Sequence, residues 1–200
     1  MNLPFDRLRD LTRARIGLGR AGDGLPTQAL LDFTMAHALA RDAVQSAVSW
    51  PSIKEALQPL ETIDVKSAAE NKTHYLRRPD LGRVLAAGEE KRLPPGPFDL
   101  VFVIGDGLSA EACMAHAVET VQATRALLKD FSVAPIILAQ GARVALSDPI
   151  GEAMQAQLVI MLIGERPGLT SADSLGAYLT FAPRAARQDS ERNCISNIHA

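Results

Sequence analysis

The pattern of hydrophobic and polar positions changes near residues 93–99, LPPGPFD. Before this segment apolar residues recur at helical spacing, and after it short uninterrupted apolar runs alternate with helical stretches. Three prolines and a glycine within seven residues cannot continue a helix or a central strand. The pattern therefore predicts a helical region at residues 1–95 and a region of mixed strands and helices at residues 96–200.

The first region is expected to contain short helices and one long helix. Helices are predicted at residues 3–16, 28–48, 52–57 and 80–87, with a glycine-rich loop at 17–27. Thr27 is the expected N-cap of the long helix, and Leu30, Phe33 and Ala40 fall near the spacing of one buried face.

The second region predicts a layered sheet. Its expected strands lie at residues 100–104, 135–141, 158–164, 177–182 and 193–198, and its helices at 110–128 and 148–156. Fully apolar strands separated by helices are typical of a parallel sheet that is covered on both faces. The predicted class is α/β, a Rossmann-like parallel sheet with flanking helices, preceded by the smaller helical region.

Ligands of such sheets bind outside the carboxyl ends of the strands. Here those ends carry the most unusual residues of the chain, namely GDGLS (105–109), QGARV (140–144), GERPGL (164–169) and CISNIH (194–199). We therefore expect a ligand at this edge of the sheet.

Composition excludes several classes of function. The 21 basic and 23 acidic residues give a net charge of -2, and aromatic residues make up only 4% of the chain, which argues against nucleic-acid binding. The longest apolar run is too short to cross a membrane, and the charged N-terminus is unlike a signal peptide. Two cysteines cannot form a disulfide framework, which favours a reduced, cytoplasmic setting.

The segment GDGLSA allows several interpretations. It resembles a loop that binds a dinucleotide at a helix N-terminus, which would make the chain a standalone NAD-type oxidoreductase. Asp106 would repel a pyrophosphate, and the next strand ends without the acid that holds a ribose. The loop could also face another large planar cofactor, or could be a tight turn that only needs glycine, as in a scaffold protein.

Three further groups of residues have both a functional and a structural interpretation. Glu165 and Arg166 offer an acceptor and a donor fork to a ligand, or form a local ion pair or cap. Cys194 could pair with His199 in catalysis, but strand alternation separates them, so a buried thiol lining a pocket is favoured. The segment HYLRRPDLGR (74–83) is a solvated loop, or a site of contact with an anion or another subunit. No metal-ligand spacing links the histidines and cysteines, so no metal site is expected.

Five segments, taken together and in order, resemble the small-subunit family of ethanolamine ammonia-lyase. The resemblance runs from about residue 13 to residue 199, through RIGLGRAGDGLPTQALLDFTMAHALARDAV, HYLRRPDLGR, IGDGLSA, IGERPGL and ERNCISNIH. It implies the light chain of an adenosylcobalamin-dependent lyase that converts ethanolamine into acetaldehyde and ammonia by a radical mechanism. It also implies that a large TIM-barrel subunit carries the substrate pocket, in a higher-order hetero-oligomer.

The same resemblance implies roles for individual residues. Val144, Glu165 and Cys194 match the positions that contact cobalamin in the family, and no catalytic residue is expected in this chain. The chain stops at His199–Ala200, where the family continues into a further helical stretch, so the second region is expected to be short. A cytoplasmic location is expected, with a bacterial microcompartment as the alternative.

Overall fold

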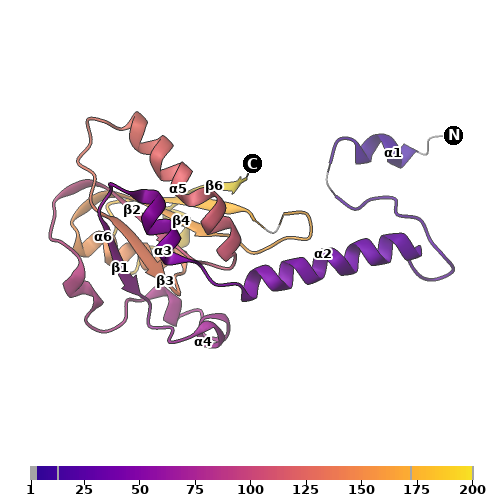
Figure 1. Cartoon of the computed structure of the whole chain (residues 1–200), viewed down its shortest axis with the longest axis horizontal. Helices are drawn as coiled ribbons and strands as arrows, with labels where there is room; N and C mark the ends of the chain where they lie inside the picture. Colours follow the sequence, from indigo (N-terminus) through magenta and orange to yellow (C-terminus); the bar gives the residue numbers. More distant parts are fainter. Residues whose placement is uncertain (1–3, 13, 172, 200) are drawn as a thin grey trace.

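The computed structural model describes residues 4–12, 14–171 and 173–199, which include one six-stranded sheet with helices packed on both of its faces (Figure 1). The helices are α1 (Pro4–Arg9), α2 (Thr27–Gln45), α3 (Trp50–Leu57), α4 (Lys72–Arg77), α5 (Ala110–Leu127) and α6 (Ser147–Ala153). The strands are β1 (Thr62–Lys66), β2 (Phe98–Gly105), β3 (Ile136–Gln140), β4 (Ala156–Gly164), β5 (Leu175–Phe181) and β6 (Asn193–Ile198). Short 3-10 turns lie at η1 (Leu81–Arg83), η2 (Glu89–Arg92), η3 (Val144–Leu146) and η4 (Asp189–Glu191).

The sheet is mixed, with the strand order β1-β3-β2-β4-β5-β6. The strands β1, β3, β2 and β4 are parallel, whereas β5 is antiparallel to both β4 and β6. The α/β class and the five expected strands are confirmed, but the expectation of an entirely parallel sheet is wrong. The described residues between β4 and β5, at 165–171 and 173–174, form no helix, and a parallel neighbour would need a longer crossover connection.

One strand, β1, was missed because it lies in the region expected to be helical. It pairs along its whole length with β3, a partner more than seventy residues further along the chain. The expected helix at residues 80–87 is also wrong, since only the turn η1 forms there. Backbone hydrogen bonds from Ala68 N to Val84 O and from Ala86 N to Lys66 O, both 2.9 Å, hold residues 84–86 against the end of β1 instead. The division of the chain at residue 96 stays a prediction.

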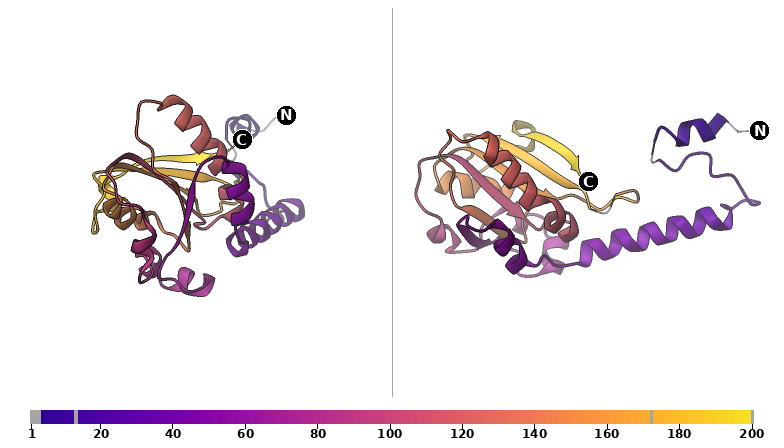
Figure 2. Two further views of the ribbon diagram at one scale, coloured as in Figure 1. Left: turned by 60° about the vertical axis from the view of Figure 1, so that its left-hand side comes forward. Right: turned by 45° about the horizontal axis from the view of Figure 1, so that its top comes forward.

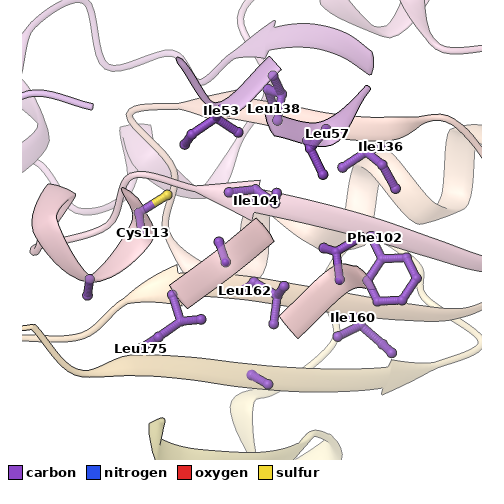
Figure 3. Close-up of a cluster of buried hydrophobic side chains, with 14 of the residues drawn as sticks. Ile53, Leu57, Phe102, Ile104, Cys113, Ile136, Leu138, Ile160, Leu162 and Leu175 are labelled. Atoms are coloured by element: carbon purple, nitrogen blue, oxygen red, sulfur yellow. The ribbon is translucent and has the colours of Figure 1, made fainter. Parts of the chain in front are cut away.

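The core has two layers, one on each face of the sheet. Along β2, Leu100, Phe102 and Ile104 pack with α3 and α5, as Figure 3 shows for Phe102 and Ile104. The alternate residues Val101 and Val103 pack with η3 and α6 on the other face. This double burial explains why β2 is apolar without interruption.

The long helix α2 leads away from the sheet (Figures 1 and 2). Most of its large apolar residues are exposed. The side chains of Leu30, Leu31, Phe33, Met35 and Leu39 are 39–63% exposed. The expected buried face is therefore wrong within this chain, because periodicity reports an apolar stripe and not what covers it. The helix includes Thr27, and Pro26 occupies the N-cap position that was expected for Thr27. None of the described helices is long and apolar enough to cross a membrane.

The position of Phe102 predicts a large loss of stability when its ring is removed. Phe102→Ala should lower the free energy of unfolding of the purified chain by about 3–5 kcal/mol, because the ring is fully buried between α5 and the sheet. Phe181→Ala is the matched control, since this ring is 70% exposed at the end of β5. Urea unfolding measures both variants, and similar losses would contradict this description of the core.

Candidate functional site

The carboxyl ends of four strands meet at one edge of the sheet. The strands β2, β3 and β4 are parallel, and β6 runs in the same direction because β5 is antiparallel to both of its neighbours. Gly164 at the end of β4 and Ile198 at the end of β6 both pair with Leu175. The segments at 105–109, 140–144, 164–169 and the end of β6 are therefore brought together, as the sequence predicts.

The carboxylate of Asp106 ties the end of β2 to the loop that follows β3. Asp106 Oδ1 accepts hydrogen bonds from Ala142 N at 2.9 Å and Gly107 N at 3.0 Å, and Oδ2 accepts from Gly141 N at 3.0 Å. Burial raises the pKa of Asp106, while these three amides and the nearby Lys72 act in the opposite direction. Asp106 is thus a structural acceptor that positions residues 141 and 142.

The GDGLS loop packs directly against the end of β4. Gly107 has a φ of +57°, and a Cβ at this position would lie 2.2 Å from Gly164 O. Leu108 N donates to the same carbonyl at 2.9 Å, while Gly107 N donates to Asp106. These two amides are already used within the chain, which favours the tight-turn interpretation and weakens the dinucleotide one.

A cavity of about 350 Å³ opens at this edge, between the loop after β3 and the end of β4. Val144 from η3 and Glu165 after β4 both line it, together with Leu108 and Tyr178. Val144 and Tyr178 pack against the apolar layer that also contains α6. Two of the three expected cobalamin contacts therefore share one open cavity with an apolar base.

One carboxylate oxygen of Glu165 accepts hydrogen bonds from neighbouring groups of this chain. Its Oε2 accepts from Ser174 Oγ at 2.8 Å and lies 3.4 Å from Asn197 N. A Cβ on Gly176 would lie 2.7 Å from Oε1, so the glycine leaves room for this carboxylate. Among the described residues Glu165 forms no ion pair with Arg166, and Oε1 takes no part in these two hydrogen bonds.

Cys194 adjoins the cavity through Tyr178. Cys194 is exposed, so the expectation of a buried thiol is wrong. Among the described residues β6 is the outermost strand on its side of the sheet, and only β5 pairs with it. Cys194 pairs in register with Tyr178, and its Sγ lies 3.3 Å from Ser196 Oγ. The buried thiol of the chain is Cys113, where burial raises the pKa to about 12 and keeps the thiol protonated.

Sequence reasoning missed the partnership between Tyr75 and Arg143. Tyr75 in α4 is only 2% exposed, and the Arg143 guanidinium lies 4.2 Å from the centroid of its ring. Arg143 Nη2 also donates to Tyr75 O at 3.0 Å. The signal in the sequence that could have indicated this contact was a tyrosine among the arginines of HYLRRPDLGR. Arg78 and Asp80 of the same segment form an exposed ion pair.

Histidines and cysteines do not gather into a metal site in the part of the chain that the structure describes. His116 Nε2 lies 3.6 Å from Asp173 Oδ2, which joins α5 to the loop before β5. This contact between an imidazole and a carboxylate places α5 beside the loop that carries Ser174, a partner of Glu165.

Comparison with known sequences identifies the family. The sequence model described as "Ethanolamine ammonia-lyase light chain (EutC)" matches residues 2–200. The chain belongs to the ethanolamine ammonia-lyase light chain family. A relative from Bradyrhizobium diazoefficiens, named ethanolamine ammonia-lyase small subunit, is 52% identical over 96% of this light chain and 77% of its own length. Similarly named relatives from Rhodopseudomonas palustris and Xanthomonas campestris are each 50% identical over 96% of this light chain and 76% and 74% of their own lengths.

The pKa of both tyrosines in this light chain generates a prediction about its behaviour in alkali. Burial raises the pKa of Tyr75, and burial with a hydrogen bond to Cys194 raises that of Tyr178 to about 12. Since the folded chain holds these protons more tightly than the unfolded chain, their contribution to stability is complete below about pH 10 and is lost as pH rises toward 12.

Ultraviolet titration of tyrosinate absorbance measures this directly, because the chain has only two tyrosines. In Tyr75→Phe, the remaining Tyr178 should titrate near pH 12 in the folded protein and near pH 10 in guanidinium. A midpoint near 10 while circular dichroism still reports the native fold would contradict the described environment of Tyr178.

Proposed function

We propose that this chain is the small subunit of an adenosylcobalamin-dependent ethanolamine ammonia-lyase. Its cavity beside Val144 and Glu165 helps to hold the coenzyme where the large subunit meets it. The observation that carries the proposal is that these two residues, expected to contact cobalamin, line one open cavity, while Cys194 lies next to the cavity residue Tyr178. The cytoplasm is the proposed location.

The residues present fit part of a corrinoid coenzyme. A corrinoid is larger than this cavity, so the chain would contact one side of it and leave the rest to the large subunit. Val144 and Leu108 offer apolar contact to the ring, and Glu165 offers an acceptor to the amide groups at the ring periphery. Cys194, exposed on β6, would pack against the edge of the same ligand.

The net reaction converts ethanolamine into acetaldehyde and ammonia. When bound, the coenzyme supplies the radical chemistry for this conversion, and the protein binds, orients and shields the reactants. This chain supplies no acid, base or nucleophile in the proposal, and the substrate binds in the TIM barrel of the large subunit. The role of this chain is therefore to position the coenzyme and exclude water from one side of it.

The local contacts of Glu165 suit it to that role. Ser174 Oγ and Asn197 N hold its Oε2, which fixes the plane of the carboxylate without using Oε1. A fixed acceptor loses little conformational entropy when a ligand amide binds. Ser174 is itself 5% exposed, so its hydroxyl is a rigid support.

The exposed apolar residues of α2 support a large protein partner. Five large apolar side chains on one helix, exposed to solvent, are typical of a protein interaction surface. The relatives are named small subunits, and we assign the large subunit as the chain that covers α2. Several copies of the two subunits then form the hetero-oligomer.

Replacing Glu165 should weaken cobalamin binding by the assembled complex. Glu165→Gln keeps the shape of the side chain but removes the charge, and we expect about a tenfold higher Kd for cobalamin, because hydrogen bonds to charged acceptors are the stronger ones. Glu119→Gln, an exposed carboxylate on α5, is the control. Corrinoid absorbance during titration gives both constants, and an unchanged Kd for Glu165→Gln would remove this residue from the site.

Placing a charge on α2 should weaken assembly with the large subunit. Leu31→Glu puts a carboxylate where we expect an apolar interface, and affinity should fall by tenfold or more. Leu127→Glu is the control, at an exposed leucine that ends α5 and is 84% exposed, against 58% for Leu31. Analytical ultracentrifugation of the mixed subunits distinguishes them, and full assembly of Leu31→Glu would show that α2 is not the docking surface.

A further inference from the structure

Three arginines surround a second hollow beside the proposed coenzyme cavity. Arg83, Arg143 and Arg192 line a cavity of about 320 Å³ together with Val144 and Tyr178. Arg143, Val144 and Tyr178 also line the cavity of Glu165, so the two hollows share a wall. We call the three arginines the arginine cluster.

Arg192 is already neutralised by a carboxylate. Its Nη2 donates to Asp148 Oδ2 at 2.7 Å, its Nη1 donates to the other oxygen of Asp148, and both side chains are almost fully buried. This pair is bidentate, so Arg192 is fixed in place and its charge is balanced. Arg192 therefore forms a rigid wall of the second hollow.

Arg83 has a weaker partner. Its Nη2 lies 3.5 Å from Asp189 Oδ2, and both side chains are more than half exposed. Exposed pairs of this kind contribute little to stability, because water screens the two charges. Arg83 can therefore turn toward a ligand at small cost.

Arg143 is positioned by neutral groups. The Tyr75 ring and the Tyr75 carbonyl hold its guanidinium, and it takes part in no ion pair among the described residues. Its Nε is buried and has no hydrogen-bond acceptor in the same part of the chain. Arg143 lines the second hollow, and a guanidinium has five N–H donors, so it can donate to a ligand there as well as to Tyr75 O.

The charges of the cluster match a singly charged anion. Three guanidinium groups face the two carboxylates of Asp148 and Asp189, which leaves one positive charge over at this hollow. Guanidinium groups bind phosphate oxygens through paired N–H donors, which suits them to this ligand better than to a neutral one. A phosphodiester carries one negative charge.

We propose that Arg143, with Arg83 beside it, binds the phosphodiester in the nucleotide tail of the coenzyme. The inference rests on the proposed function, since it places the tail in the hollow next to the one assigned to the ring. Val144 and Tyr178, which line both hollows, would lie between ring and tail. The arginine cluster thereby distinguishes complete cobalamins from corrinoids that lack the phosphate.

The test compares cobalamin with cobinamide, which keeps the corrin ring but lacks the phosphodiester and the benzimidazole. Both are titrated into the assembled complex of large and small subunits, carrying either the native chain or Arg143→Gln. The substitution should raise the Kd for cobalamin by tenfold to a hundredfold, because it removes a charged hydrogen-bond donor to the phosphodiester. The Kd for cobinamide should change far less, because Arg143 only borders the cavity of the ring. Cobinamide phosphate should respond to the substitution as cobalamin does.

Two further variants separate binding from folding. Arg143→Lys keeps the charge without the planar fork and should give an intermediate loss for cobalamin alone. Arg78→Gln removes an exposed arginine outside both hollows and should change neither constant. Thermal unfolding of each complex without corrinoid checks that the Arg143 variants are folded.

Four outcomes would contradict the proposal in different ways. An equal loss for both corrinoids in Arg143→Gln would show that Arg143 only supports the fold of the site. An unchanged Kd for both corrinoids would show that Arg143 is not involved. Binding of inorganic phosphate to the cobalamin-loaded complex, lost in Arg143→Gln, would assign the cluster to free phosphate. Failure of the native complex to bind either corrinoid would overturn the proposed function together with this inference.

Discussion

The candidate site depends on the hydrogen bonds that the partly buried carboxylate of Asp106 accepts. This carboxylate accepts hydrogen bonds from Gly141 and Ala142, the two residues directly before Arg143 and Val144. Since the same carboxylate follows β2, one side chain fixes the loop after β3 to the centre of the sheet. The contact of the GDGLS loop with the end of β4 fixes the opposite wall, from which Glu165 emerges. The geometry of both hollows follows from these two constraints.

The central strands and α5 could be predicted because their signals are local. The apolar runs of β2, β3 and β4 are buried on both faces, and a glycine turn separates β2 from α5. The strand β1 and the extended residues 84–86 could not be predicted, because each is stabilised by pairing with distant backbone. The spacing of apolar residues predicted the position of α2 but not the exposure of its side chains. Apolar residues have the same spacing whether the surface that packs on the helix belongs to this chain or to another.

The position of the candidate site could be predicted from the rule that ligands bind outside the carboxyl ends of parallel strands. That rule, with the resemblance to the family, pointed to Val144 and Glu165, which line one cavity. The burial of Cys194 was mispredicted, because a strand pattern does not reveal which strand lies at the edge. Tyr178 and Arg143 were missed, since their contacts join segments that no local pattern connects. The apolar side chains of α2 and the cavity beside Glu165 are both open to solvent. Both features are expected of a subunit whose binding site is completed by another chain.

A structure of the two assembled subunits with bound cobalamin tests the central claim most directly. The account predicts that the corrin ring covers the cavity between Val144 and Glu165, with Cys194 at its margin. A ring bound elsewhere in the complex, with these three side chains in contact only with protein or water, would contradict it.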